Sequence, residues 1–284
     1  MLRKLMKYEI KATGRTFLLM FSAILVLSVI NRLLMSDSMS YITNSDNFVM
    51  PLIFGFMMFL YVIAIVGTIL AVMILMVMRF YKNLLGDEGY LSFSLPVKTW
   101  QHLVSKMLVG SMWLVSGIIT TLISVFIMLS HPDILSELWL MLDNFFNKFL
   151  PDIAPYLDYR FGIFVTEFLI ALLICVVSAF LPLFTAIMIG QLWQKHRVLG
   201  AVIAYLGMGF VSQIVNSIAT NSFISSDPTR ILFYHDYYAV EEFFSALYST
   251  ANGGLLTFII ITLVFNAAYF FIANHLMKNR LNLE

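Results

Sequence analysis

Long apolar stretches alternate with short polar ones along this chain, and the apolar stretches are long enough to cross a membrane. A spanning helix needs about 20 mostly apolar residues. The pattern predicts spans at residues 17–35, 48–78, 103–129, 162–190, 198–219 and 254–274. We therefore expect an all-α integral membrane protein, with residues 1–284 forming a single transmembrane domain.

The second predicted span has no charged residue between Phe48 and Met78. At about 1.5 Å per residue it is longer than the hydrocarbon core of about 30 Å. It must therefore tilt or project beyond the bilayer. The projecting part would lead into a polar segment at residues 79–102.

Composition supports a membrane protein, because 61% of the 284 residues are hydrophobic, 12% are charged and the mean hydropathy is +0.90. Soluble domains average about 25% charged residues. The net charge of +1 gives no reason to expect nucleic-acid binding. The apolar run from Phe17 lacks a small-x-small cleavage site, so we expect a retained span and not a signal peptide.

Charge is sorted between two sets of loops, which predicts the orientation. Most of the 17 lysines and arginines lie at the N-terminus, in residues 79–106, in the turn at 191–197 and in the C-terminal tail. Most of the 16 acidic residues lie in the other loops. Because basic loops stay inside the cell, both termini are expected in the cytoplasm and the protein in the plasma membrane.

The basic N-terminus, residues 1–16, has the pattern of an amphipathic helix. Leu2, Leu5, Met6 and Ile10 lie near one helical face. Such a helix can lie in the headgroup layer with its bases near anionic lipid; a simple topogenic charge cluster is the alternative. The surrounding bases are Arg3, Lys4, Lys7 and Lys11.

The predicted external loops are residues 36–47, 130–161 and 220–253. The second contains LSELWLMLDNFFNKFL, which is expected to form a helix at the outer mouth or on the bilayer surface. The third contains YHDYYAVEEFF, which would be either a structural cap or a gate that contacts a substrate.

Polar residues inside spans are functional candidates, because burying them in lipid is costly. Arg32 and Glu167 lie at similar depth, so they would either pair at the outer rim or point separately to water or headgroups. Small residues in the fifth span predict close helix packing, within the fold or across a dimer. Pro182 is expected to kink the fourth span. The polar residues are Asn31, Arg32, Glu167, Gln213, Asn216 and Asn266, and the small ones are Gly200, Ala204 and Gly207.

No catalytic or cofactor-binding constellation is evident. The chain has no GxxxxGK[ST] phosphate loop and no HExxH motif, and its five histidines lack metal-ligand spacing. We therefore expect a non-catalytic protein that binds no metal or cofactor itself.

The segment RFYKNLLGDEGYLSFSLPVKTWQHLVSK, residues 79–106, is the most specific part of the sequence. With the basic amphipathic start and six spans, it resembles the permease subunits of ATP-binding-cassette transporters of the type-2 exporter class, as found in Firmicutes. The matching positions are an acidic turn, an "slP" element and a basic stretch before the third span. They include Gly86, Asp87, Glu88, Gly89, Pro96 and Lys98.

The resemblance implies that two permease subunits, identical or related, pair with two separate ATPase subunits that bind ATP and magnesium. Residues 79–102 would supply the coupling helix that docks on the ATPase, and the amphipathic start would also touch it. Spans one and five would lie near the subunit interface. The few charges in the spans favour a hydrophobic or amphipathic cargo such as a peptide, drug or lipid.

Two other classes of function stay open from the sequence. One is a stand-alone membrane binding or sensor protein, such as the binding component of an uptake system. The other is a membrane enzyme, which the missing catalytic constellation disfavours.

Asp87 and Glu88 would pair with basic residues of the ATPase, cap the N-terminus of a short helix, or do both. If they contact the ATPase, replacing Asp87 and Glu88 together with Ala should reduce complex assembly or ATPase stimulation while the membrane fold stays intact. Co-purification and ATPase assays would measure this. Normal assembly with normal transport would refute the role of the turn.

Overall fold

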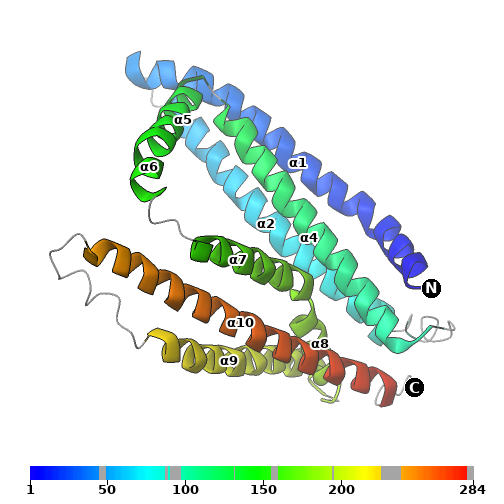
Figure 1. The fold of residues 1–284 in the computed structure, drawn as a ribbon. Helices are drawn as coiled ribbons and strands as arrows, with labels where there is room; N and C mark the ends of the chain where they lie inside the picture. The colour runs from blue at the N-terminus through cyan, green and yellow to red at the C-terminus, as the bar shows by residue number, and fades with distance from the viewer. Residues whose placement is uncertain are drawn as a thin grey trace. The chain divides into compact units, whose positions relative to one another are not determined.

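The computed structural model describes residues 1–44, 49–86, 89, 97–130, 132–154, 159–193, 195–224 and 238–279 (Figure 1). Within these residues every regular element is a helix, and six helices are long and apolar enough to cross a membrane. The all-α membrane fold predicted from the sequence is confirmed. The helices are α1 (Leu2–Asn44), α2 (Val49–Leu85), α4 (Thr99–Leu129), α5 (Pro132–Asn144), a π-helical turn (Phe145–Phe149), α6 (Leu150–Ile153), α7 (Tyr159–Ser178), α8 (Leu181–Gly190), α9 (Arg197–Ile224) and α10 (Tyr238–Asn279).

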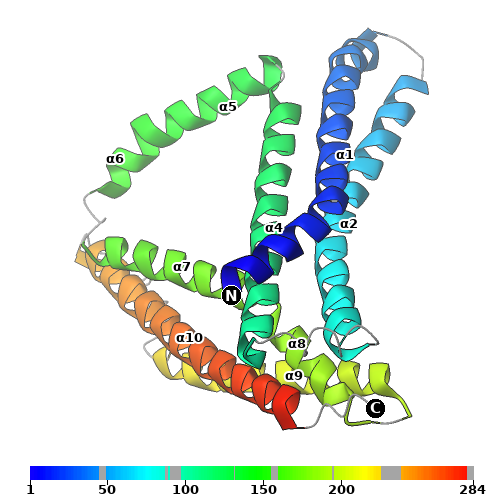
Figure 2. The same ribbon diagram turned by 90° about the vertical axis from the view of Figure 1, so that its right-hand side faces the viewer.

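Several helices are longer than the apolar pattern predicts. Helix α1 includes both the expected interfacial segment 1–16 and the expected loop 36–47 as far as Asn44, and α10 begins inside the expected loop 220–253. No glycine or proline interrupts residues 36–44, so the backbone can stay helical after the apolar run has ended. Figure 2 shows that α1 changes direction near its N-terminus although it stays helical.

The predicted fourth span is broken into α7 and α8 by a turn at residues 179 and 180. Pro182 lies at the start of α8 and cannot donate the usual helical hydrogen bond to the Ser178 carbonyl. The sequence predicts a kink at Pro182, and the structure has a larger change there, a break into two helices. The expected helix in 130–161 is also present, as α5, the π-helical turn and α6.

The chain divides into two compact units. Unit 1 consists of residues Met1–Lys82 and Gln101–Phe146. Its helices α1, α2 and α4 run side by side (Figures 1 and 2). The centre of this bundle is aromatic, because the rings of Phe17 and Trp113 lie 5.0 Å apart and those of Phe21 and Trp113 lie 6.1 Å apart.

Unit 2 consists of residues Asn83–Trp100 and Asn147–Glu284 and contains helices α7 to α10. Helix α10 contacts α7, α8 and α9, and α8 packs closely on α9. Phe180 and Phe184, at the start of α8, are fully buried. The Thr185 hydroxyl lies 3.2 Å from the Tyr269 carbonyl oxygen, which adds a polar contact between α8 and α10.

Two helices of unit 2 approach closely at Gly190. A Cβ atom added there would lie 2.5 Å from the Ala201 backbone nitrogen and 2.6 Å from the Arg197 carbonyl oxygen. Gly200 lies on the other side of this contact, where an added Cβ would be 3.3 Å from the Gly190 Cα. Only glycine at position 190 lets α8 and α9 approach this closely.

We expect Gly190→Ala to lower the free energy of unfolding by about 1–3 kcal/mol, because backbone atoms must move apart to admit the methyl group. Gly207→Ala is the matched control, since no described atom lies within 4 Å of a Cβ added there. Thermal unfolding followed by size-exclusion chromatography would compare the two. Equal melting temperatures for both variants would contradict the close-contact interpretation.

Candidate functional site

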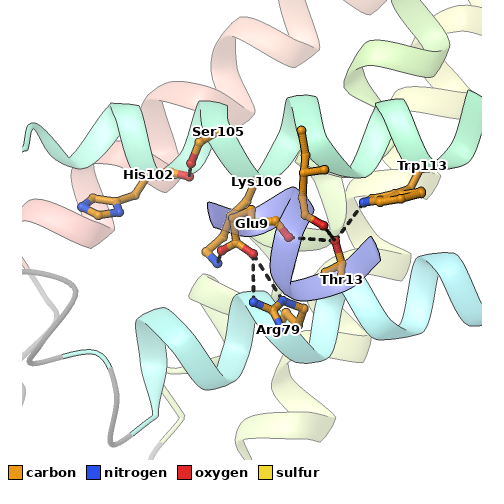
Figure 3. Close-up of polar contacts among 8 residues, drawn as sticks. Glu9, Thr13, Arg79, His102, Ser105, Lys106 and Trp113 are labelled. Carbon is orange, nitrogen blue, oxygen red and sulfur yellow. Dashed lines mark hydrogen bonds and ion pairs between the residues drawn. The ribbon is translucent and has the colours of Figure 1, made fainter. Parts of the chain in front are cut away.

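Glu9 of α1 lies between two basic side chains from the other helices of unit 1 (Figure 3). Its Oε2 accepts hydrogen bonds from Arg79 Nε at 3.2 Å and Arg79 Nη2 at 3.1 Å. Its Oε1 accepts a hydrogen bond from Lys106 Nζ. The side chains are 12% exposed for Glu9, 4% for Lys106 and 30% for Arg79. These three residues are called the Glu9 clamp below.

A second set of hydrogen bonds joins the clamp to the aromatic centre of unit 1 (Figure 3). Thr13 lies one turn after Glu9, and its hydroxyl donates to the Glu9 carbonyl oxygen at 2.8 Å. The same hydroxyl oxygen accepts a hydrogen bond from Trp113 Nε1 at 2.8 Å. The start of α1 is therefore attached to α4 at two successive turns.

The Glu9 clamp holds the two helices that flank the predicted coupling segment. Arg79 lies near the end of α2, and Lys106 lies near the beginning of α4. Both basic residues pair with the same carboxylate, so the two ends of the segment are tied to one point on α1. Breaking a buried pair by removing one partner typically costs about 3–5 kcal/mol. The geometry can thus transmit a displacement of the segment to three helices.

The predicted coupling residues lie only partly within the described residues. The Gly89 amide donates to the Gly86 carbonyl oxygen at 2.8 Å. Lys98 is exposed. Asp87, Glu88 and Pro96 lie outside the described residues.

The end of this segment also bonds to the last helix. Thr99, the first residue of α4, donates a hydrogen bond from Oγ1 to Asn274 Oδ1 of α10 at 2.9 Å. Both residues belong to unit 2. Sequence analysis singled out neither residue.

The amphipathic pattern of the N-terminal residues has a structural counterpart. The four predicted interfacial bases Arg3, Lys4, Lys7 and Lys11 are exposed, whereas Leu2, Leu5, Met6 and Ile10 are half-buried. This agrees with the predicted faces of the helix. A place in the lipid headgroup layer stays a prediction.

The polar residues predicted near the ends of spans have different surroundings. Asn31 is fully buried, and its Nδ2 donates to the Leu27 carbonyl oxygen at 3.0 Å and the Met57 carbonyl oxygen at 3.4 Å. Arg32 Nη2 donates to the Ser130 carbonyl oxygen at 3.3 Å. Glu167 is half-buried in α7 of the other unit. An Arg32–Glu167 pair therefore stays untested.

The small residues of α9 differ in their exposure and in what they contact. Gly200 is buried against Gly190 and Trp193 of its own chain, so packing within the fold explains it. Ala204 is half-buried, whereas Gly207 is exposed with no described atom within 4 Å of an added Cβ. A dimer contact along this helix stays a prediction for the Gly207 face.

Asn266 lines a half-open cavity of about 330 Å³ in unit 2, together with Gln213 and Asn216. Sequence analysis named these residues separately, and the fold brings them together. The cavity lies between α9 and α10, beside the break between α7 and α8.

Sequence reasoning missed Glu9. It also counted Arg79 and Lys106 among the bases of a solvent-facing segment, whereas both pair with Glu9. The available signal was a lone acidic residue within the basic stretch MLRKLMKYEIKATGR. A single acidic residue within such a basic stretch indicates a basic partner in the folded protein.

Comparisons give no relative for this chain: no known protein family, curated protein or solved structure matches it. Within the described ranges, no group of three or more His, Cys, Asp or Glu residues could hold a metal ion.

We expect Glu9→Gln to lower the free energy of unfolding by about 3–5 kcal/mol, because Lys106 stays buried without its carboxylate. Lys11→Gln is the matched control on the same helix, because Lys11 is exposed and surface changes stay within about 0.5 kcal/mol. Thermal unfolding in detergent would measure both.

Adding Lys106→Met to Glu9→Gln should recover part of the lost stability, because the buried ammonium is removed as well. A melting temperature for Glu9→Gln equal to that of the unchanged protein would contradict the stabilising role of the Glu9 clamp.

Proposed function

We propose that this chain is the membrane-spanning permease subunit of an ATP-binding-cassette exporter. It would move a hydrophobic or amphipathic compound, powered by a separate ATPase subunit that binds ATP and magnesium. In this proposal it lies in the plasma membrane with both termini in the cytoplasm. It pairs with a second permease copy or a related permease and with two ATPase copies.

The Glu9 clamp is the observation that carries this proposal. A transport subunit without its own ATPase must convert contact with a soluble partner into helix movement, and this requires a rigid connection. The clamp ties Arg79, at the start of segment 79–102, and Lys106, four residues after its end, to α1 through ion pairs in which Glu9 and Lys106 are little exposed. The Thr99–Asn274 hydrogen bond gives the same segment a connection to α10.

The charges on the proposed docking side also suit contact with a soluble partner or with anionic lipid. Lys98 and the four N-terminal bases are exposed, while Arg79 and Lys106 are used internally. The exposed bases remain available for a protein partner or for anionic lipid. The basic residues thus divide between holding the bundle together and facing outward.

A stand-alone membrane binding or sensor protein, or the binding component of an uptake system, is the second candidate. The cavity in unit 2 favours it, because binding a small molecule requires no ATPase. The two candidates differ in their partners: only the exporter requires a stable complex with an ATPase.

Purification of the tagged chain from its native operon in mild detergent tests the proposal. We expect an ATPase subunit in equal amount, with a complex mass of two permeases and two ATPases by light scattering. ATP hydrolysis by the complex should respond to the Asp87 and Glu88 substitutions. A chain that purifies alone, from an operon without an ATPase gene, would contradict the exporter and favour the second candidate.

A further inference from the structure

The cavity in unit 2 is built from two matching helical stripes. Each stripe has the spacing i, i+4, i+7, i+8 and i+11, which keeps its members on one face of a helix. On α9 they are Tyr205, Gly209, Ser212, Gln213 and Asn216, and on α10 they are Phe258, Thr262, Phe265, Asn266 and Tyr269. The volume of about 330 Å³ lies within the range of small-molecule sites.

The third wall of the cavity is the broken helix. Cys175, Ser178 and Ala179 come from the end of α7 and the turn, and Pro182 comes from the first turn of α8. Interrupted helices are tolerated at membrane depth where they line a cavity, since lipid cannot satisfy the freed backbone groups. Discontinuous helices also form many substrate sites in transporters.

The lining is mostly apolar, and its polar groups carry no charge. The described lining residues include no Asp, Glu, Lys, Arg or His, yet they include the amides of Gln213, Asn216 and Asn266. An amide within a membrane-spanning helix is costly unless it is hydrogen-bonded. Aromatic rings supply the apolar surface around these amides. The site is therefore suited to a molecule that has hydrogen-bonding groups and an apolar body.

Asn216 has a hydrogen-bonding capacity that the protein does not use. Its Nδ2 donates to the Ser212 carbonyl oxygen at 2.9 Å, which fixes the orientation of the amide. Its Oδ1 is buried and has no hydrogen-bond partner in the described part of the chain. A buried acceptor without a donor costs about 1–3 kcal/mol, so a ligand N–H or O–H that reached it after a small turn of the side chain would relieve this cost.

We propose that this cavity binds an uncharged amphipathic molecule with an aromatic or aliphatic body and at least one hydrogen-bonding group, such as an amide, a hydroxyl or a carbonyl. The apolar body would lie against Phe258, Phe265 and the tyrosine rings, and the polar groups would bond to the amides. A charged ligand is disfavoured, because it would lose its hydration without meeting an opposite charge. Identifying this molecule as the cargo rests on the proposed transport function, whereas the binding site itself does not.

Two glycines of α9 provide a matched pair of variants. No described atom lies within 4 Å of a Cβ added at either Gly207 or Gly209, and neither glycine has a positive φ. Gly209 lines the cavity, whereas Gly207 lies two residues earlier, on the opposite side of the helix from the stripe. Gly209→Phe would fill the cavity, and Gly207→Phe would place the same ring outside it.

The binding assay uses Nile red, an uncharged dye with an aromatic body and a carbonyl oxygen that can accept a hydrogen bond from an amide N–H, with the purified full chain in phosphatidylcholine nanodiscs and no ATPase present. Binding is the saturable fluorescence above that of empty nanodiscs. Gly209→Phe should raise the Kd at least tenfold, and Gly207→Phe should leave it within twofold. Asn266→Leu keeps the helix and removes one amide, so it should raise the Kd about fivefold to tenfold.

The outcomes separate the site from the transport function. No saturable binding by the unchanged protein, or the same Kd in the unchanged protein, Gly209→Phe and Asn266→Leu, would overturn the site even if an ATPase co-purifies. Cavity-dependent binding without an ATPase partner would support the binding site and contradict the proposed exporter function. Rhodamine 6G, a cationic dye, should not compete, and equal competition by it would overturn the preference for an uncharged ligand.

The source of the natural ligand can be distinguished in the same assay. Displacement of Nile red by dioleoylglycerol would support the site with an uncharged lipid as its occupant. Retention of cavity-dependent dye binding in the presence of that lipid would support the site with a compound from outside the lipid pool.

Discussion

A single buried carboxylate organises unit 1. Glu9 accepts hydrogen bonds from basic residues on two other helices, and its neighbour Thr13 accepts another from Trp113. Charges with little exposure are tolerated only when paired, so the three helix ends must stay together for any of them to be stable. The aromatic contacts of Phe17 and Phe21 with Trp113 then determine how the same helices pack farther along.

Unit 2 depends on a different constraint, the close contact of two backbones. The absence of side chains at Gly190 and Gly200 lets α8 lie directly on α9, and this geometry fixes where the broken helix meets the other spans. The cavity lies farther along α9, between Tyr205 and Asn216, beside the break between α7 and α8. Ion pairs thus join the helix ends of one unit, and the lack of side chains at two glycines lets two helices of the other unit approach closely.

The sequence predicted the helical membrane fold well, because a run of apolar residues has one physical explanation in a chain of this composition. It predicted a kink at Pro182, where the structure has a break, because the missing amide proton of a proline acts locally on the helix. The helix ends of α1 and α10 were misplaced, because hydropathy reports where lipid is favourable and not where backbone hydrogen bonds stop.

Contacts between distant residues could not be predicted in this way. Glu9 pairs with residues 70 and 97 positions away, and no periodicity in the sequence indicates such a partner. The polar residues Gln213, Asn216 and Asn266 were visible one by one, but only the packing of α9 on α10 places them around one cavity. Asp87, Glu88 and Pro96, which the family resemblance emphasises, lie outside the described residues.

The length of α1 has a consequence for the parts of the protein outside the lipid. Its 43 residues extend about 64 Å at 1.5 Å per residue. Even a helix tilted by about 40° needs only about 39 Å of its length to cross the hydrocarbon core. More than a third of α1 must then lie in headgroups or water while remaining helical. Since proteases cut most readily at exposed loop tips, these protruding ends would resist digestion far better than loops of the same length.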